Sequence, residues 1–284
     1  MAFNGSDGRY RIGSASIDFN KETVIMGILN VTPDSFSDGG RHNGTDDAVR
    51  RALQMREEGA KIIDVGGEST RPGHTVISVD EELSRIVPVI ERLKDEEGMC
   101  LSVDTYKAEV ARGALDAGAH IVNDIWGARR EPDIAKLAAE RDVPIILMHN
   151  REEANYREFW PDAKADLEES IKVAIDAGVS NRNIWLDPGI GFAKSTKENI
   201  LMMQHLADLV AMGYPVLLAT SRKRMIGNIL DLPVNERMEG TGATVCYGIS
   251  KGCHMVRVHD VKEIARMTRM MDVLTGKSEY KGDL

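Results

Sequence analysis

The sequence predicts a (β/α)8 barrel preceded by a short hairpin. Short apolar segments rich in β-branched residues alternate along the chain with longer segments whose apolar residues have helical spacing. The apolar segments show little polar alternation, which is typical of strands buried on both faces of a parallel sheet. The alternation recurs about eight times, and the 284 residues leave room for a hairpin beside the roughly 250 residues that such a barrel needs.

The elements follow one another without a long unstructured segment. Arg9–Phe19 is expected to form a hairpin across the barrel floor. The expected strands are Val24–Leu29, Ile62–Val65, Leu101–Val103, His120–Val122, Val143–Met148, Ile184–Leu186, Val216–Ala219 and Met255–Val258. The expected helices are Asp46–Glu58, Asp80–Glu97, Lys107–Ala117, Pro132–Arg141, Asp162–Ala177, Thr196–Met212, Glu236–Lys251 and Lys262–Leu274, and several are followed by a glycine that suits a left-handed cap.

The order of these elements decides the sheet. Strands separated by helices must be parallel and joined by right-handed crossovers, which leaves an open doubly wound sheet or a closed barrel. Eight repeats favour the barrel. We expect one domain over residues 1–284, with 1–20 as an N-terminal extension, 21–276 as the barrel and 277–284 as a tail.

Composition limits the possible partners and location. The net charge of −9 argues against binding to nucleic acid, because neutralising phosphates requires a basic face. No apolar run approaches the roughly 18 residues of a membrane helix, and the polar N-terminus does not resemble an export signal. Cys100, Cys246 and Cys253 lack metal-ligand or redox spacing and suit a reducing compartment. We therefore expect a cytoplasmic protein without membrane or nucleic-acid partners.

Polar residues gather where the expected strands end. In a barrel of this kind the carboxyl ends of all strands meet at one mouth, so residues far apart in sequence share a site. Carboxylates and an amide follow the third, fourth and sixth strands, and cations follow the seventh and eighth. Such a mouth suits a flat, nitrogen-rich ring held by the acids and an anionic group held by the cations. The residues are Asn30, Glu68 to Arg71, Asp104, Asn123, Asp124, His149, Asp187, Ser221 to Lys223, Arg257 and His259.

Four segments at these strand ends resemble a known family. They are Met26–Gly40 (MGILNVTPDSFSDGG), Gly66–Gly73 (GGESTRPG), Asp187–Phe192 (DPGIGF) and Ser221–Lys223 (SRK). Together they are similar to bacterial dihydropteroate synthase over nearly the whole chain. The resemblance implies a barrel enzyme that joins p-aminobenzoate to 6-hydroxymethyl-7,8-dihydropterin diphosphate, with Mg²⁺ on the diphosphate, and that forms a homodimer through its late helices.

The resemblance also implies a role for individual residues. The pterin ring would be held by Asp104, Asn123, Asp187 and Lys223, with Met148 and Phe192 near its apolar walls. Asn30 would contact Mg²⁺, while Thr70, Arg257 and His259 would meet the diphosphate. The expected catalytic residues are Asp104, Lys223, Arg257, Asp34 and Arg71.

The aminobenzoate pocket is expected at the rim of the mouth. Ser221, Lys223 and the closed loops, with Phe36 in the first of them, would shape this pocket, where sulfonamides compete in that family. Arg224 stands where some members carry serine, so the charge at the pocket rim is expected to differ.

Three other interpretations stay open at this stage. A pterin-barrel methyltransferase that uses methyltetrahydrofolate would share the acids but would not need a diphosphate clamp. A non-catalytic pterin-binding protein would have no evident use for a metal contact and a closing loop. Ser221 and Lys223 also invite a Ser–Lys nucleophile reading, which would need an oxyanion site and an orienting partner. Taken alone, His149 is expected to be structural, and the loop Thr32–Gly40 has the composition of an ordinary turn.

Overall fold

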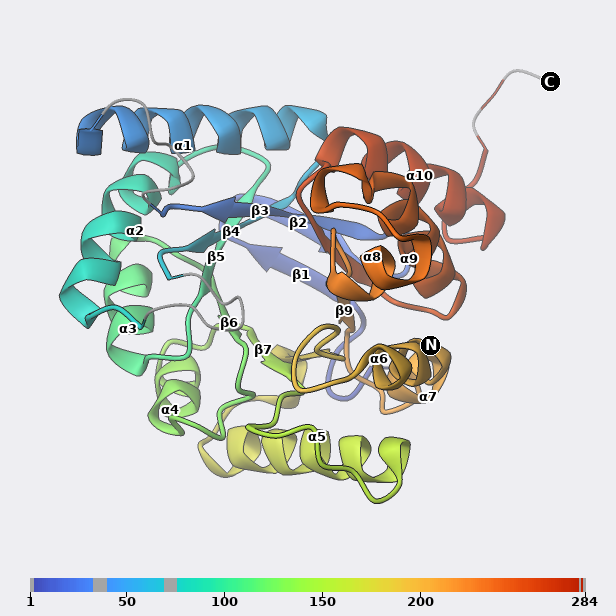
Figure 1. The fold of residues 1–284 in the computed structure, drawn as a ribbon. Helices are drawn as coiled ribbons and strands as arrows, with labels where there is room; N and C mark the ends of the chain where they lie inside the picture. The colour runs from blue at the N-terminus through green and yellow to red at the C-terminus, as the bar shows by residue number, and fades with distance from the viewer. Residues whose placement is uncertain (1–2, 33–39, 69–75, 281, 283–284) are drawn as a thin grey trace.

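The structure of the protein is a computed structural model. It describes residues 3–32, 40–68, 76–280 and 282, without the side chains of 40–43. Within these ranges, parallel strands form a barrel surrounded by helices (Figure 1). Asp34, Phe36, Thr70 and Arg71 lie outside the described residues. Among the described helices, none combines the length and the apolar character required to cross a membrane.

Eight strands line the described barrel in the order β8-β7-β6-β5-β4-β3-β10-β9. The two ends of this sheet meet, because Leu186 pairs with Val216 and its backbone N–H donates to the Pro215 carbonyl at 2.8 Å. The barrel is therefore closed, as the sequence predicts. The strands are β3 (Val24–Asn30), β4 (Ile62–Gly66), β5 (Cys100–Asp104), β6 (Ile121–Asp124), β7 (Ile145–Met148), β8 (Ile184–Asp187), β9 (Leu217–Leu218) and β10 (Met255–Val258).

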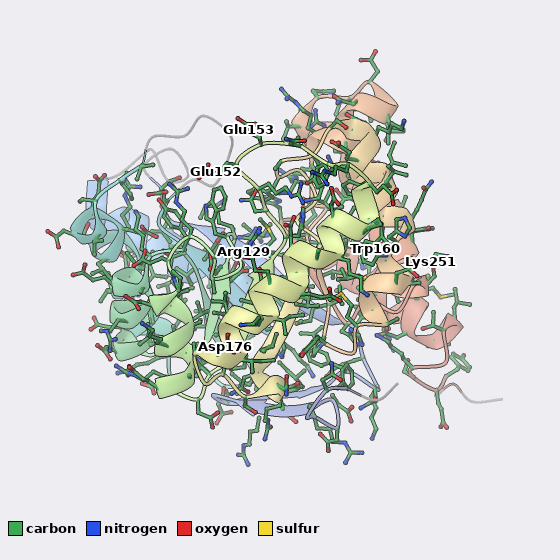
Figure 2. The ribbon with its side chains drawn as sticks, turned by 90° about the horizontal axis from the view of Figure 1, so that it is seen from below. Arg129, Glu152, Glu153, Trp160, Asp176 and Lys251 are labelled. Atoms are coloured by element: carbon green, nitrogen blue, oxygen red, sulfur yellow. The ribbon has the colours of Figure 1, made fainter. Side chains whose placement is uncertain are left out.

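Helices follow the strands and cover the outside of the barrel (Figure 1). Figure 2 shows α5 along this outer surface, with Trp160 near its first turn and Asp176 at its end. Ser195 and Glu198 form a reciprocal capping box at the start of α6, which satisfies backbone N–H groups that the helix itself cannot pair. The helices are α1 (Gly40–Glu58), α2 (Val79–Leu93), α3 (Ala108–Ala117), α4 (Asp133–Glu140), α5 (Phe159–Asp176), α6 (Thr196–Gln204), α7 (Leu206–Val210), α8 (Arg224–Leu230), α9 (Met238–Ser250) and α10 (Val261–Leu274).

Two regions differ in kind from the expected elements, and α1 also begins at Gly40 and not at the expected Asp46. The helix expected over Thr196–Met212 is split into α6 and α7 at His205, whose ring bonds Asp208 at 2.7 Å and stacks on Trp160. Helix α8 was not expected at all, because seven residues are too few for an apolar period to show. It ends at Asp231, which adopts a left-handed conformation with φ of 54°.

The N-terminal hairpin closes the barrel floor, as expected. Strands β1 (Arg9–Ile12) and β2 (Ala15–Asp18) pair antiparallel, and their inward side chains join the lowest inward residues of the barrel strands in one apolar cluster. Phe19 lies edge-on to the Trp185 ring, with 5.5 Å between centroids. The members of this cluster, called the floor cluster below, are Tyr10, Ile12, Ala15, Ile17, Phe19, Val24, Met26, Ile62, Cys100, Ile121, Ile146, Trp185, Leu217 and Met255.

Candidate active site

The polar residues at the mouth lie directly above the floor cluster on the same strands. Side chains two positions apart on a strand point to the same face, so the residue two positions after a floor residue also faces the barrel axis. Asp64 follows Ile62 in this way, and Arg257 follows Met255. Asn123 and Asp187 follow two further floor residues in the same way. The alternation therefore stacks a charged layer on an apolar one.

Arg257 is the centre of the charged layer. Its Nε donates to Asp64 Oδ2 at 2.6 Å, and its second terminal nitrogen, Nη2, donates to Asp104 Oδ2 at 2.6 Å. Asn123 Nδ2 also donates to Asp64 Oδ2, at 3.0 Å. Residues from β4, β5, β6 and β10 thus form one hydrogen-bonded cluster, Asp64–Asp104–Asn123–Arg257, called the mouth cluster below.

The mouth cluster carries two acids for one guanidinium. Burial alone would lower the pKa of Arg257, but the adjacent carboxylates of Asp64 and Asp104 raise it well above its ordinary value, so the guanidinium stays charged. Burial raises the pKa of Asp104, and Arg257 offsets only part of that rise. Among the described residues, Oδ1 of each carboxylate is buried without a hydrogen-bond partner. Such oxygens are available to N–H donors of a ligand.

Asp187 and Lys223 complete the part of the mouth where the pterin ring is expected. Gly189 N–H donates to Asp187 Oδ1 at 2.6 Å, which fixes the carboxylate at the end of β8. Burial raises the pKa of Asp187 to about 6, although Lys223 and Arg257 act to lower it. The Lys223 ammonium lies 4.4 Å from the centroid of the Phe192 ring. Asp187, Lys223 and Arg257 therefore share one electrostatic environment.

Ser221 and His259 connect the ends of β9 and β10. Ser221 Oγ lies 2.9 Å from His259 Nδ1 and accepts the His259 backbone N–H at 3.2 Å. The serine O–H is then free to donate to Nδ1, which favours the tautomer with its proton on Nε2. The next residues of the two segments are joined as well, because Arg222, in a left-handed conformation with φ of 57°, donates to Asp260 at 2.5 and 3.0 Å.

Asn30 lies at the end of β3 beside the mouth cluster. A Cβ atom on Gly66 would lie 3.5 Å from Asp104 Cβ and 3.8 Å from Asn30 Oδ1, so glycine keeps the space between these two side chains open. In the described part of the chain, no three His, Cys, Asp or Glu side chains converge as a metal site. Asn30 presents one amide oxygen beside the mouth cluster, a donor type that suits Mg²⁺ when water and substrate oxygens complete its coordination.

Comparison with known proteins agrees with this site. The model of the pterin binding enzyme family matches residues 26–259. Dihydropteroate synthase of Bacillus subtilis is 59% identical over 263 residues, which cover 93% of this chain and 92% of that protein. The chain belongs to the dihydropteroate synthase family.

Solved structures of dihydropteroate synthases share the fold. The enzyme from Clostridium difficile, solved in the presence of pteroic acid, superposes with a TM-score of 0.88 at 47% identity over 91% of this chain and 98% of that one. The enzyme from Xanthomonas albilineans, solved with 4-aminobenzoic acid, gives a TM-score of 0.89 at 39% identity over 95% and 98% of the two chains.

The sequence analysis did not identify two residues that support the site. Asp64 had a weak signal, a lone carboxylate inside the apolar run Ile62–Val65. The sequence signal for Lys194 was weaker still, because this residue lies two positions beyond the Asp187–Phe192 motif. Its ammonium donates to the carbonyls of Gly189 at 2.9 Å and Phe192 at 3.0 Å. Both residues support expected site residues through contacts that cross the barrel or its loops.

Two polar residues at the mouth serve the scaffold. The Asp124 carboxylate accepts the backbone N–H groups of Trp126 at 2.8 Å and Ala128 at 2.6 Å, which closes the turn after β6. His149, expected to be structural, bonds Asp166 at 3.0 Å. Burial lowers the pKa of His149 to about 4, so its imidazole is neutral at physiological pH. Met148 is buried at the end of β7, where a wall residue is expected.

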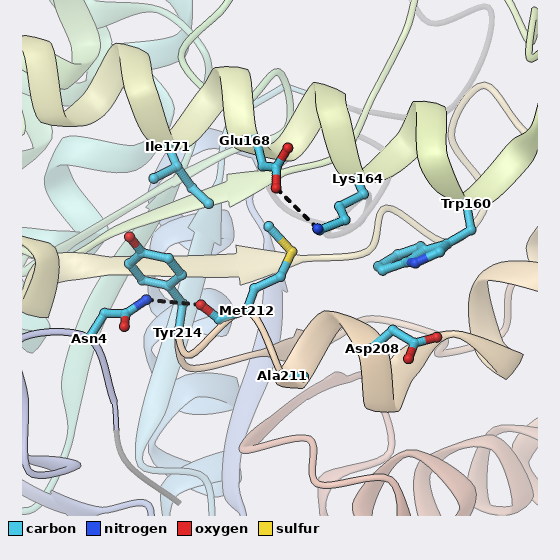
Figure 3. Close-up of a pocket in the computed structure, with 9 residues that line it drawn as sticks. All are labelled: Asn4, Trp160, Lys164, Glu168, Ile171, Asp208, Ala211, Met212 and Tyr214. Atoms are coloured by element: carbon cyan, nitrogen blue, oxygen red, sulfur yellow. Dashed lines mark hydrogen bonds and ion pairs between the residues drawn. The ribbon is translucent and has the colours of Figure 1, made fainter.

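One cavity of the structure lies away from the mouth. It has a volume of about 530 Å³ and opens on the outside of the barrel, between α5 and the segment that follows α7. Figure 3 shows the Lys164–Glu168 ion pair above it and the hydrogen bond from Asn4 to the Met212 carbonyl below it. No residue of the mouth lines this cavity, so its size says nothing about the chemistry.

Proposed function

We propose that this chain joins 6-hydroxymethyl-7,8-dihydropterin diphosphate to p-aminobenzoate, releasing diphosphate and forming 7,8-dihydropteroate. The observation that carries the proposal is the buried mouth cluster, in which Arg257 ties together acids from separate strands. A flat donor-rich ring meets acids there, and an anionic leaving group meets cations, which is the reaction expected of the family.

The pterin end of the substrate meets the acids. The ring presents several N–H donors along its edge, and a carboxylate accepts two such donors side by side. Asp104, Asn123 and Asp187 supply these acceptors, and the Lys223 ammonium beside Phe192 supplies a donor to ring acceptors. The buried Oδ1 atoms of Asp64 and Asp104, unpaired among the described residues, leave acceptor capacity for the ring.

The diphosphate end meets Arg257 and His259. A guanidinium has five N–H donors, and two of them bond Asp64 and Asp104, which leaves three for phosphate oxygens. His259, two positions after Arg257 on the chain and bonded to Ser221, would add an imidazole N–H donor to the same phosphate group. Thr70, outside the described residues, belongs to the same group by resemblance.

Charge separation governs the chemical step. Breaking the C–O bond to diphosphate places positive charge on the pterin methylene and negative charge on the leaving group, so fixed charges lower the barrier when they face these sites. Asp104 stabilises the methylene cation, while Arg257 and His259 stabilise the departing anion. The amine of p-aminobenzoate then attacks the methylene carbon, forming the C–N bond as the C–O bond to diphosphate is lost, and the proton released from its nitrogen passes to solvent. Asp34, Phe36 and Arg71 would close over both substrates.

Mg²⁺ would be held by Asn30 together with substrate oxygens. The amide oxygen stands beside Asp104 across the space that Gly66 keeps open, and Mg²⁺ in phosphate sites commonly uses few protein ligands. When bound, the ion would neutralise charge on the leaving diphosphate.

The aminobenzoate pocket would lie by Ser221 and Lys223, which are in the segment between β9 and α8. Arg224 is the exposed first residue of α8, and its guanidinium would add positive charge near a carboxylate-bearing ligand.

Calorimetric titration with the dihydropterin diphosphate, with and without Mg²⁺, followed by a diphosphate-release assay with p-aminobenzoate, tests the function. We expect Mg²⁺-enhanced binding and release that requires the amine. A non-catalytic binding protein would bind without release, and a methyltransferase would bind pterin without any preference for the diphosphate. Absence of release under every metal condition would contradict the proposal.

We further propose a cytoplasmic homodimer. The exposed apolar side chains of Ile229, Leu230 and Val234 on and after α8, and those of Met270 and Leu274 on α10, are suited to subunit contact. All three cysteines are free thiols, which suits a reducing compartment. Analytical ultracentrifugation should give twice the monomer mass, and a sedimenting monomer at micromolar concentration would contradict the dimer.

A further inference from the structure

Lys194 places an ammonium group among three backbone carbonyls. Its Nζ donates to Gly189 O at 2.9 Å and Phe192 O at 3.0 Å, and approaches His149 O at 3.4 Å. A lysine ammonium has three N–H donors, so the three carbonyls can each accept one of them. The arrangement resembles a carbonyl site for a small cation, with the cation attached to the protein. We call these three oxygens the carbonyl cage.

The carbonyl cage joins two strand ends. His149 directly follows β7, and Gly189–Phe192 is the turn after β8. The backbones approach closely there, since a Cβ on Gly189 would lie 1.9 Å from His149 O. Gly189 has φ of 66°, a conformation that glycine adopts readily. Three carbonyl dipoles that face one another repel, and the Lys194 ammonium offsets this repulsion together with the Phe192 backbone N–H, which Gly189 O also accepts at 3.1 Å.

The same turn carries groups of the mouth. Gly189 N–H donates to Asp187 Oδ1 at 2.6 Å, and the Phe192 ring faces the Lys223 ammonium at 4.4 Å. A Cβ on Gly191 would lie 3.1 Å from Lys223 Cδ, so this backbone also limits where Lys223 can lie. A shift of the turn would move the supports of Asp187 and Lys223 together.

The site holds its cation against a cost. Burial lowers the pKa of Lys194 to about 7, Lys223 lowers it further, and Asp187 acts in the opposite direction. The three carbonyl oxygens accept N–H groups of the ammonium and so favour its protonated form against this effect, since a buried charge requires compensating polar groups.

We propose that Lys194 is a positioning residue whose ammonium acts as a built-in cation for the carbonyl cage, and thereby sets Asp187 and Lys223 for the pterin ring. The inference deepens the proposed function and rests on it for its kinetic readout. Its structural readout, described below, does not depend on the reaction.

Lys194→Ala tests the proposal by chemical rescue. We expect kcat/KM for the dihydropterin diphosphate to fall about 10- to 100-fold, because small displacements at a site are costly. Methylammonium or ethylammonium at about 100 mM should restore part of the loss by entering the cage, whereas tetramethylammonium at equal ionic strength, which has no N–H donor, should not. A folded variant as active as the parent, or one that no primary amine rescues, would overturn the proposal.

Two further variants control for packing and for loss of one hydrogen bond. Lys194→Met fills the same space without charge, and we expect weakened pterin binding that no amine rescues; parental pterin affinity in this variant would also overturn the proposal. Tyr156 OH donates to Ala193 O at 2.9 Å in the same turn, and Tyr156→Phe should cost about fivefold or less. A loss from Tyr156→Phe as large as that from Lys194→Ala would assign the effect to the turn and not to the cation.

Thermal unfolding separates this inference from the function. The Tm of Lys194→Ala should rise with ethylammonium and not with tetramethylammonium, in the absence of substrate. If the parent protein releases no diphosphate but the Tm of Lys194→Ala shows this selectivity, the proposed reaction is contradicted and the role of the carbonyl cage is supported. If the parent is active and the Tm shows no selectivity, the role of the carbonyl cage is contradicted and the proposed reaction is supported.

Discussion

The floor and the mouth of the barrel use the same strands for opposite purposes. At the floor, inward side chains such as Trp185, with none of its surface exposed, pack against the hairpin in an apolar cluster. At the mouth, two residues further along, the inward residues are charged: Asp187 is buried, and Arg257 keeps only 14% of its side chain exposed. Burial stabilises the floor, whereas at the mouth burial works against the charged groups and must be offset by ion pairs.

The contrast separates the part that holds the fold from the part that does the chemistry. Replacing a floor residue removes apolar contacts and should change stability. Replacing a mouth residue removes one member of a cluster of two acids, an amide and a guanidinium, and should change ligand binding whether or not it also changes stability. The predictions below test this division from the largest expected effect to the smallest.

Arg257→Ala should have the largest effect, because it removes the central cation of the mouth. Asp64 and Asp104 would be left buried without their partner, which typically costs about 3–5 kcal/mol of folding free energy. Affinity for dihydropterin diphosphate should fall much more than affinity for the bare pterin, because the diphosphate loses its guanidinium. Chemical denaturation and calorimetry with both ligands measure the two effects, with Arg257→Lys as a charge-retaining control. Equal losses for both ligands would place Arg257 away from the diphosphate.

Phe19→Ala should act on the floor alone. The ring is 1% exposed and contacts Tyr10 and Trp185, so its removal should lower the free energy of unfolding by about 3–5 kcal/mol. Below the unfolding transition, kcat should stay within about twofold of the parent value, since the hairpin lies at the opposite end of the barrel. Arg11→Ala, on the exposed face of the hairpin, is the matched control. A strong loss of kcat in folded Phe19→Ala would contradict the division between a stabilising floor and a catalytic mouth.

Asp187→Asn should weaken pterin binding with little change in fold. An amide of the same shape offers one acceptor oxygen where the carboxylate offers two, so a buried N–H of the ring is left unpaired, at a cost of about 1–3 kcal/mol. That corresponds to about 5- to 150-fold in Kd, measurable by calorimetry. Unchanged pterin affinity would count against the assignment of Asp187 to the ring.

The pH dependence of pterin binding should reveal the same carboxylate. Ring binding requires the ionised form, so the part of the affinity due to Asp187 is complete above its pKa of about 6 and is lost as the pH falls through 6. Below that pH the loss should approach about tenfold per unit. Asp187→Asn should lack this component, and identical pH profiles of the parent and the variant would contradict it.

The stability of the free protein should change in the opposite direction. The pKa of Asp187 is raised in the folded state from 3.8 to about 6. The folded state therefore binds the proton more tightly, and this group's stabilising contribution is lost as the pH rises from 3.8 to 6. Denaturation of parent and Asp187→Asn across that range measures it.

The sequence determined the architecture and most of the mouth. Alternating strands and helices predict a closed parallel barrel because no other arrangement of eight such units buries every apolar segment so simply. Once the strands are parallel, their carboxyl ends must converge, so Asp104, Asn123, Asp187, Lys223 and Arg257 could be assigned to one rim from local pattern alone. The floor hairpin at Arg9–Phe19 followed from the same local pattern.

Only the tertiary structure decided which of these groups contact one another. The pairing of Arg257 with Asp64 and Asp104 spans 193 and 153 positions of sequence, and it depends on the register of strands whose pairing no local pattern fixes. The carbonyl cage around Lys194 consists of backbone oxygens, which every residue possesses and which therefore leave no trace in side-chain identity. Helix α8, too short to show a period, likewise became visible only in the folded chain. Local chemistry sets the elements and their direction, whereas the partners of a buried charge are set by the closure of the barrel.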